Sequence, residues 1–534
     1  MKKHKISLLF LATLATLCSS SAFAALNSYT HANGSTVINI NQADANGLSH
    51  NMYQNFNVTN KGTIINNSTT DLVRESGNIA RNSNLDRSAS LILNEVISKS
   101  PSALNGFIEV AGQKADVIIA NPNGISCSGC SFINTGRATL TTGTPTFSDG
   151  TLTGFKVAKG TIAVNGKGLK GADYTDLLAK KINIQGMIET SQLNAIAGTY
   201  DYDIASAQVT ANGNTRLFSN SIDVSELGGA TAGIIQLQTT EAGAGVNNSG
   251  ILNASGLYIA SNGALTNSGT LQSGVISASA INGITNKGHL SSAQTALQSS
   301  GTFNNSGTIE ATDYINVVSA GKFSNSENAQ ITAAGNINVV SIAGDIENTG
   351  KISAGKTLVM QTGYGSVDGT MTAIANTRLL NSGSLQAGNI SLNAVKEINL
   401  SSGGEVTTPG TAYLSASKVS NAATLAGQNT SIVANEVQNS GLMQTTGTLS
   451  VYGKNDILNT GTLKAGTLAL TTDEKISNSS CILWVLCTKG TMEADKITIT
   501  APKIASLSDL DGHYSTQTLE LNKPAASSEP ASSL

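Results

Sequence analysis

The chain has 534 residues, of which 54 are glycine and 7 are proline, and its formal net charge is −3. Charged residues make up 12% of the sequence and aromatic residues 4%, and a globular protein usually carries about twice that charged fraction. Low charge with few prolines excludes ordinary disorder, and the lack of a basic stripe excludes a nucleic-acid-binding protein. The apolar 40% of the chain suits a thin, regular core.

The first segment predicts a cleaved secretory signal over residues 1–24. Residues 2–5 hold three lysines, and the apolar run behind them is shorter than the roughly 20 residues that cross a bilayer. Ala22–Ala24 has the small-residue pattern of a cleavage site. We therefore expect an exported protein whose mature chain begins at Ala25; an uncleaved membrane anchor is the alternative.

Residues 25–245 lack a clean repeat and are interpreted as a distinct N-terminal module. Their clearest local signal is a tight turn after the apolar run 117–119, which predicts a buried strand. Pro122 presets φ for the turn, and Asn123 and Gly124 tolerate left-handed geometry.

Four cysteines follow the predicted signal, and they form two close pairs: Cys127, Cys130, Cys481 and Cys487. In an exported protein such pairs indicate two small disulfides. A zinc site would require both pairs to meet across about 350 residues, and no histidine lies near either pair. We therefore expect disulfides and no metal.

The stretch 120–130, which reads ANPNGISCSGC, resembles the secretion domain of two-partner secretion exoproteins. That family includes filamentous haemagglutinins, haemolysins and contact-dependent inhibition proteins of Gram-negative bacteria. Further matching stretches lie at residues 55–58, 62–67, 92–96, 106–112 and 139–145. The resemblance implies a right-handed parallel β-helix. It also implies a cognate outer-membrane transporter, which recognises the domain in the periplasm before the chain threads out and folds outside the cell.

The resemblance places transporter recognition in two segments, which contain Asn55, Asn57, Asn121, Pro122, Asn123, Gly124 and Ile125. We expect Asn121 and Asn123 to shape the turn and to present a surface to the transporter. The alternative is that they only stabilise the turn. A separate acidic aromatic segment, Tyr200–Asp203, is a candidate contact for a ligand or calcium, with an exposed loop as the alternative.

Residues 246–512 repeat a unit of Asn, a small polar residue, Gly, any residue, and then Leu or Ile. Copies begin every 19 residues at Asn248, Asn267, Asn286 and Asn305. Weaker copies begin at Asn325, Asn348, Asn381, Asn421, Asn439, Asn459 and Asn478. The gap between Asn381 and Asn421 fits two coils, one with a degraded signature. A period near 20 is too short for helical-pair repeats and fits one coil of a β-solenoid.

The period therefore predicts an all-β solenoid with about 19–20 residues per coil, and the resemblance implies that this solenoid is a right-handed parallel β-helix. The Asn-Ser-Gly triplet is expected to form a turn because Asn and Gly tolerate positive φ. Stacked Asn side chains are expected to hydrogen-bond from coil to coil as a ladder. With coils about 4.8 Å apart, about 25 coils would form a rod on the order of 120 Å long. The alternative, a low-complexity linker, does not explain the regular Ile and Leu positions.

The last repeat carries about ten extra residues between Asn478 and Gly490. We expect this insertion to leave the solenoid as a loop on one face. Its apolar residues are Ile482, Leu483, Trp484, Val485 and Leu486. They form either an exposed contact tip, because exposed apolar patches mark interaction sites, or a cap over the open end of the solenoid. Residues 513–534 are polar and predict a disordered tail.

These features favour an adhesive exoprotein, released or retained at the surface of a Gram-negative bacterium, with a host-cell or bacterial receptor. The alternative is a short or truncated relative of a haemolysin or a contact-dependent inhibition protein. Because the coils reach only about residue 505, we expect no toxin domain. An enzyme acting on polysaccharide needs clustered acids, Arg or His on one face, and the five histidines do not recur at one-coil spacing. We therefore expect neither catalysis nor a cofactor.

Overall fold

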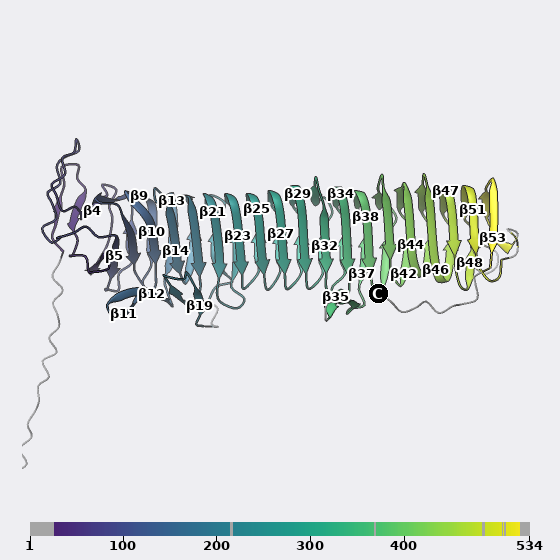
Figure 1. The fold of residues 1–534 in the computed structure, drawn as a ribbon, viewed down its shortest axis with the longest axis horizontal. Helices are drawn as coiled ribbons and strands as arrows, with labels where there is room; N and C mark the ends of the chain where they lie inside the picture. The colour runs from purple at the N-terminus through teal and green to yellow at the C-terminus, as the bar shows by residue number, and fades with distance from the viewer. Residues whose placement is uncertain are drawn as a thin grey trace, which may run out of the picture.

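The computed structural model describes residues 26–213, 217–367, 370–482, 486–504, 506 and 509–523, so the predicted signal at 1–24 lies outside them. All elements of the described residues are strands, and most of them stack in parallel into one long β-helix (Figure 1). This architecture confirms the predicted fold. No helix among the described residues has the length and apolar character to cross a membrane.

Each regular coil has three faces, which we name the ladder face, the middle face and the long face in chain order. The long face runs the whole rod, and twenty strands of the described residues pair along it in parallel. They belong to β3 (Leu48–Tyr53), β5 (Leu91–Val96), β8 (Ala115–Ala120), β10 (Thr135–Thr141), β14 (Tyr174–Ala179), β17 (Gln192–Ala197), β21 (Gly229–Thr239), β23 (Ile251–Ser261), β25 (Thr270–Ala280), β27 (His289–Ser299), β29 (Thr308–Ser319), β32 (Ile337–Ser341), β34 (Lys351–Thr362), β38 (Ser384–Ala394), β41 (Thr411–Ser415), β44 (Asn429–Asn439), β46 (Thr448–Asn459), β47 (Thr462–Thr471), β51 (Thr491–Thr500) and β53 (Thr518–Asn522).

The rod is shorter than predicted. Twenty coils at about 4.8 Å spacing extend about 90 Å, against about 25 coils expected. In the repeat region the spacing is regular, since Leu257 pairs with Ile276 and Ile276 with Thr295, 19 residues apart each time. Near the N-terminus the same face needs 43 residues to advance from Leu48 to Leu91. Loops and inserted strands therefore use residues that the estimate had assigned to coils.

The predicted asparagine ladder is confirmed at the end of the ladder-face strands. Asn267 Nδ2 donates to Asn286 Oδ1, and Asn286 Nδ2 donates to Asn305 Oδ1, both over 2.8 Å. The same bond joins Asn248 to Asn267, Asn305 to Asn325, Asn325 to Asn348, Asn348 to Asn381, Asn421 to Asn439, Asn439 to Asn459 and Asn459 to Asn478. Leu400 occupies the ladder position between Asn381 and Asn421, which is the degraded signature.

We expect Asn286→Ala to lower the free energy of unfolding by about 2 kcal/mol, because it removes two ladder bonds inside a buried column. Urea unfolding followed by circular dichroism measures the change. The control is Thr285→Ala, whose half-buried side chain lies on the outer surface, and which we expect to stay within about 0.5 kcal/mol. Equal unfolding midpoints for Asn286→Ala and the unmodified protein would contradict this role for the ladder.

The repeat glycine has a different role from the predicted one. Gly250, Gly269 and Gly288 do not have a positive φ, so the prediction of left-handed turn geometry is wrong for these positions. A Cβ at Gly269 would lie 2.1 Å from the carbonyl oxygen of Gly250, and one at Gly288 would lie 2.1 Å from that of Gly269. Glycine is required there because successive coils approach each other too closely for any side chain.

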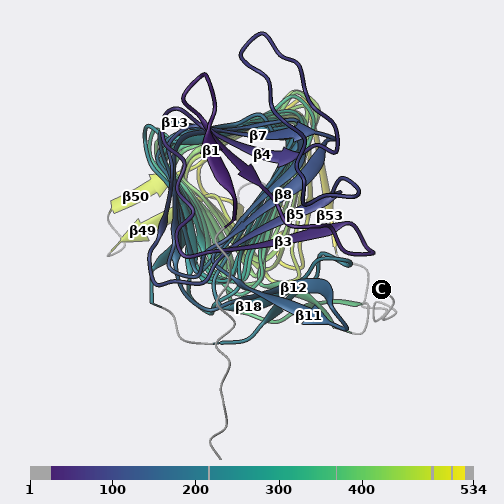
Figure 2. The ribbon, with the colours of Figure 1, turned by 90° about the vertical axis from the view of Figure 1, so that its left-hand side faces the viewer.

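Two insertions in the N-terminal coils assemble into a second, antiparallel sheet outside the solenoid (Figures 1 and 2). Its strands are β11 (Thr144–Ser148), β12 (Thr151–Val157), β18 (Tyr200–Asp203) and β19 (Val209–Ala211). Phe155, Tyr200 and Tyr202 pack with long-face residues in a second core, so the exposed-loop interpretation of Tyr200–Asp203 is wrong. Burial raises the pKa of both tyrosines, and the nearby Asp176 carboxylate raises that of Tyr202 further.

The prediction that a disordered tail begins at residue 513 is wrong, because residues 513–515 and 518–522 form strands. β52 (His513–Ser515) and β53 pair in parallel with β51 and extend the coils to Asn522. Leu521 packs against the solenoid core, and the alternating Thr-Leu-Glu-Leu pattern of 518–521 is typical of a strand despite the polar composition. Residues 524–534 lie outside the described part of the chain.

Candidate functional site

The Asn-Pro-Asn-Gly turn lies at the corner between β8 and β9 (Ile125–Ile133), where the long face passes into the ladder face. Asn121 is fully buried. Its Nδ2 donates to Ser100 O and to Ser102 Oγ, both over 3.0 Å, and its Oδ1 accepts from the Asn123 backbone N–H over 3.0 Å. Gly124 has φ +116°, whereas Asn123 has no positive φ, so only Gly124 takes the predicted left-handed geometry.

The neighbouring coils hold this turn from both sides. Asn123 Nδ2 donates to Ser98 O over 2.7 Å, and Lys159 Nζ donates to Asn123 Oδ1 over 3.3 Å. A Cβ at Gly160 would lie 2.8 Å from Pro122 O, so the following coil passes directly against the turn. Asn121 and Gly124 are therefore structural, while Pro122 and Asn123 remain partly exposed.

The structure brings the Asn55–Asn57 segment close to this turn. The connection is β6 (Ser102–Leu104), because Asn57 Oδ1 accepts from Ala103 N–H over 2.8 Å while Asn121 donates to the adjacent Ser102. Asn55 and Asn57 are both exposed, and they line a groove of about 430 Å³ at the N-terminal end of the rod. Both predicted recognition segments thus lie at one end of the molecule, two coils apart, with the coil of β6 between them.

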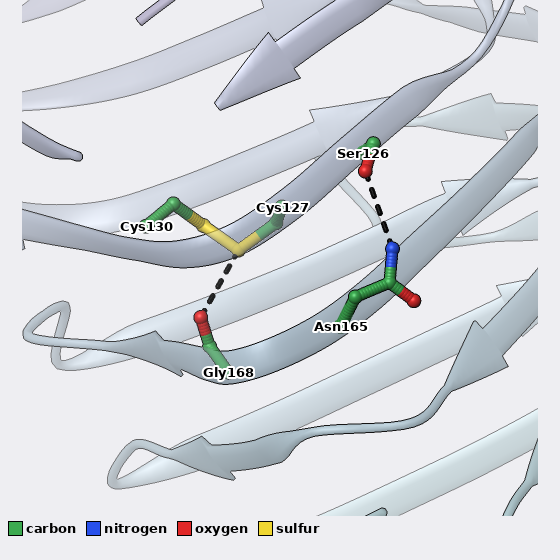
Figure 3. Close-up of a disulfide and its surroundings, with 5 residues drawn as sticks. All are labelled: Ser126, Cys127, Cys130, Asn165 and Gly168. Atoms are coloured by element: carbon green, nitrogen blue, oxygen red, sulfur yellow. Dashed lines mark hydrogen bonds between the residues drawn. A yellow bond between two sulfur atoms is a disulfide. The ribbon is translucent and has the colours of Figure 1, made fainter. Parts of the chain in front are cut away.

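Cys127 and Cys130 form a disulfide inside β9 (Figure 3). Both cysteines are buried, and Cys127 Sγ lies 3.3 Å from Gly168 O on the next coil. The pairing of β9 with β13 (Thr161–Lys170) shifts register between Asn165 and Leu169, next to the disulfide. From Asn165 to Leu169, β13 advances four residues while β9 advances only two, so the disulfide lies beside a bulge in the following coil.

We expect Cys127→Ser with Cys130→Ser to lower the free energy of unfolding by only about 2 kcal/mol, because the closed loop is very short. Peptide mass mapping of the exported protein should find the two sulfurs joined. Free thiols at both positions after export would contradict the bond. Cys481 and Cys487 also form a disulfide in the structure, with a sequence separation of 6. The same peptide mass mapping of this second pair is the comparison.

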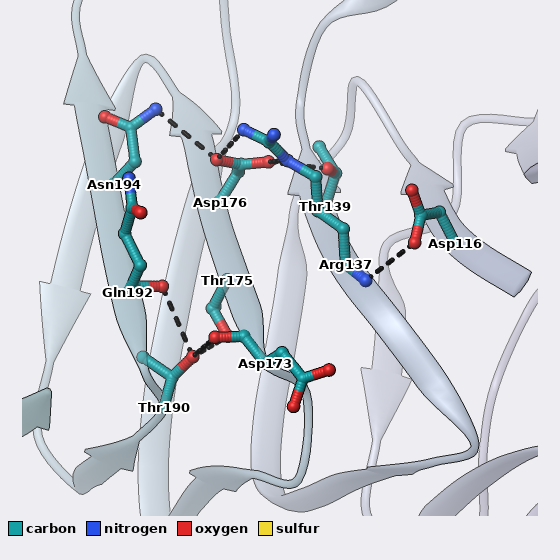
Figure 4. Close-up of polar contacts among 9 residues, drawn as sticks. All are labelled: Asp116, Arg137, Thr139, Asp173, Thr175, Asp176, Thr190, Gln192 and Asn194. Carbon is teal, nitrogen blue, oxygen red and sulfur yellow. Dashed lines mark hydrogen bonds and ion pairs between the residues drawn. The ribbon is translucent and has the colours of Figure 1, made fainter. Parts of the chain in front are cut away.

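A second polar cluster lies on the long face, where β10, β14 and β17 pair in parallel (Figure 4). The Asp176 carboxylate accepts from Arg137 Nε over 2.6 Å, Arg137 Nη2 over 2.9 Å, and Thr139 Oγ1 over 2.8 Å. The hydrogen bond to Asp176 raises the pKa of Arg137, and nearby carboxylates raise it further against the effect of burial. Asn194 Nδ2 of β17 also donates to this carboxylate over 3.4 Å, so Asp176 is a structural anchor for three coils.

Sequence reasoning missed a buried ion pair in the same corner as the Asn-Pro-Asn-Gly turn. Lys180, Thr199 and Glu241 follow the long-face strands of three successive coils, β14, β17 and β21. Lys180 Nζ donates to Glu241 Oε1 and to Thr199 Oγ1, and the side chains of Lys180 and Glu241 are only 6% and 0% exposed. No periodic pattern marks these residues, so the sequence offers no signal for the pair.

The predicted insertion forms a hairpin of β49 (Ser479–Ile482) and β50 (Leu486–Lys489), which pairs with none of the described coil strands (Figure 2). The residues of β50 are exposed, and Leu486 is 72% exposed. The apolar residues Leu483, Trp484 and Val485, together with the side chain of Ile482, lie outside the described part of the chain. Among the described residues, no group of three or more His, Cys, Asp or Glu could hold a metal ion.

Comparison with known proteins identifies the N-terminal half. The family model described as the TPS secretion domain matches residues 19–273. "Toxin CdiA" of Yersinia pestis is 41% identical over 251 residues, which are 45% of this chain and 8% of that protein. "tRNA nuclease CdiA-2" of Burkholderia pseudomallei (strain 1026b) is 38% identical over 248 residues, which are 44% of this chain and 8% of that protein. The crystal structure of a filamentous hemagglutinin secretion domain is 30% identical, covers 54% of this chain and 97% of its own, and has a TM-score of 0.42.

Proposed function

The chain belongs to the two-partner secretion exoproteins through the TPS secretion domain at residues 19–273, and on that premise we propose that a cognate outer-membrane transporter exports it. The transporter recognises the domain in the periplasm, and the repeat region then folds outside the cell. The observation that carries this proposal is the convergence of Asn57 and the Asn121 turn on adjacent residues of β6. Two segments far apart in sequence are thereby held as one surface.

Burial divides the recognition residues into two groups. Asn121, Gly124 and Ile125 are buried and set the shape of the corner. Asn55 and Asn57 are exposed, and Pro122 and Asn123 are partly exposed, so these four provide the contact surface. Amide side chains both donate and accept hydrogen bonds, which suits an uncharged contact with a periplasmic receptor domain.

Coexpression with and without the cognate transporter tests the export proposal. Immunoblots of the culture medium should detect the protein only when the transporter is present. Asn55→Arg should reduce release while leaving the melting temperature of the purified protein unchanged, because Asn55 is exposed. The matched control is Asn304→Arg, which is partly buried on the ladder face and lies outside the secretion domain. Release that does not depend on the transporter, or equal release of both variants, would contradict the proposal.

For the exported protein, an adhesive role at the cell surface or in released form is the function that we propose. The hairpin β49–β50 is its candidate contact, because it leaves the solenoid and exposes Leu486. A disulfide between Cys481 and Cys487 fixes this hairpin, which limits the conformational entropy lost on contact.

Fluorescence of Trp484, the single tryptophan of the chain, is expected to be red-shifted and readily quenched in the free protein. Because a contact tip loses water on binding, the emission should move to the blue when target cells or membranes are added. Blue emission that resists quenching in the free protein would identify the hairpin as a cap and would contradict the contact role.

The two relatives named CdiA favour a second candidate, a role in contact-dependent inhibition. The toxin and nuclease activities in their names belong to those proteins, of which this chain covers 8% each. Coculture of producing cells with a susceptible strain distinguishes the candidates. A fall in viable target cells that requires contact favours inhibition, whereas binding without a fall in viability favours adhesion.

A further inference from the structure

A shallow groove of about 540 Å³ lies at the corner between the middle face and the long face, in the second half of the rod. Four consecutive coils line it. Gln386 of β38 pairs in register with Thr407 of β40 (Glu405–Thr407), and Ala426 of β43 (Thr424–Gly427) pairs with Gln444 of β45 (Leu442–Thr445). Because Thr407 also pairs with Ala426, these residues form one row parallel to the rod axis.

The floor of the groove is apolar and closely packed. Thr408 Oγ1 donates to Gly388 O over 2.7 Å, so its hydroxyl is already satisfied by the coil before it. A Cβ at Gly427 would lie 2.9 Å from Thr408 Cγ2, so Gly427 keeps the floor open where any other residue would fill it. Pro409 and Ala426 complete the apolar lining.

The walls of the groove carry amides and hydroxyls that the protein itself does not use. The side chains of Gln386, Gln428 and Gln444 make no hydrogen bond to any described residue, nor do those of Thr407 and Thr446. None of the lining residues is charged. The next residue in the row beyond Gln444 is Lys464, whose ammonium group is paired with Glu493 over 2.8 Å.

We propose that this groove binds a neutral polysaccharide that runs along the rod axis. Neutral sugars present hydroxyl groups that both donate and accept, which matches free side-chain amides, and apolar C–H surfaces, which match the floor. An anionic ligand would find no cation in the lining. The coils repeat about every 4.8 Å, close to the length of one sugar residue in an extended chain, so successive residues meet successive coils.

A peptide strand fits this groove less well than a sugar chain does. Strand addition needs an unpaired sheet edge, and β40, β43 and β45 are each paired on both sides. Only side chains therefore remain for recognition.

This inference rests on the adhesive role proposed above, and it is tested with the purified full chain. Isothermal titration calorimetry would use neutral hexasaccharides of glucose, mannose and galactose, with an oligogalacturonate as the charged comparison. We expect a neutral hexasaccharide to bind, and the variant Gln386→Ala with Gln444→Ala to bind it at least tenfold more weakly. The control is Gln272→Ala, an exposed glutamine in the same row five coils earlier, which should bind as the unmodified protein does.

Three outcomes would overturn the proposal: no binding of any neutral hexasaccharide, tighter binding of the oligogalacturonate, or unchanged affinity of the double glutamine variant. Cell adhesion is measured separately with the same proteins. Adhesion without hexasaccharide binding refutes the groove and leaves the adhesive function standing. Hexasaccharide binding without cell adhesion refutes the adhesive function and leaves the groove as a sugar site.

Discussion

Replacing Asn121 with isoleucine is expected to stop release of the protein into the medium, with at least a tenfold fall when the cognate transporter is present. Asn121 is fully buried, and its side chain joins the turn to Ser100 and Ser102 on one side and to Asn123 on the other. Isoleucine has no polar atom, so it leaves these partners unsatisfied, each at about 1–3 kcal/mol. The turn then loses its fixed position relative to β6.

The rod itself should survive this change. The coils on either side are held by parallel pairing between β5 and β8 and between β8 and β10, which does not involve the Asn121 side chain. Circular dichroism should therefore remain dominated by β-structure. The effect on release follows because Asn57 is bonded to the same short strand, so the two proposed recognition segments would no longer hold one relative position.

Asn286→Ala is the matched control for this experiment. It also removes a buried amide that bonds to two neighbouring coils, but it lies outside the secretion domain at 19–273. If loss of stability alone blocked export, both variants would fail to the same degree. Full release of Asn121→Ile with the cognate transporter would refute the recognition role of this turn.

The period of the sequence predicts the coil because each coil repeats the same pairing with its neighbours. The ladder asparagines, the inward Leu and Ile positions and the degraded signature at Leu400 all follow from this local repetition. The role of the repeat glycines does not follow from the period, because only glycine fits where the carbonyl oxygen of Gly250 approaches Gly269. That distance exists only once the coils are stacked.

Contacts between distant insertions were beyond prediction for a different reason. β12 and β18 each have the pattern of a short strand, but nothing in either pattern specifies the other as its partner. The closeness of Asn57 to Asn121 could not be predicted from the period either, because the chain needs 43 residues to complete the coil between Leu48 and Leu91. Irregular coils remove the fixed spacing by which residues of neighbouring coils are matched.

Lys180→Met is expected to lower the free energy of unfolding by about 3–5 kcal/mol, the effect of removing one partner from a buried ion pair. Glu241 is fully buried, and its Oε2 already has no hydrogen-bond partner among the described residues. Without the Lys180 ammonium group its charge is left uncompensated in the corner. Thermal and urea unfolding of the purified protein measure the loss.

Two further variants separate charge from packing. Lys464→Met removes one partner of an exposed pair, Lys464 with Glu493 at 46% and 49% exposure, and should change stability by less than about 1 kcal/mol. Lys180→Met with Glu241→Leu should recover much of the loss, because a buried ion pair can be replaced by apolar residues at little net change.

The chain leaves the solenoid after Thr142 and after Thr199 to build β11–β12 and β18–β19, in the same corner as Lys180. If Lys180→Met lowers the free energy of unfolding by less than about 1 kcal/mol, the ion pair does not hold these two departure points of the chain together. Recovery of stability in the double variant would show that the pair stabilises the corner through charge balance.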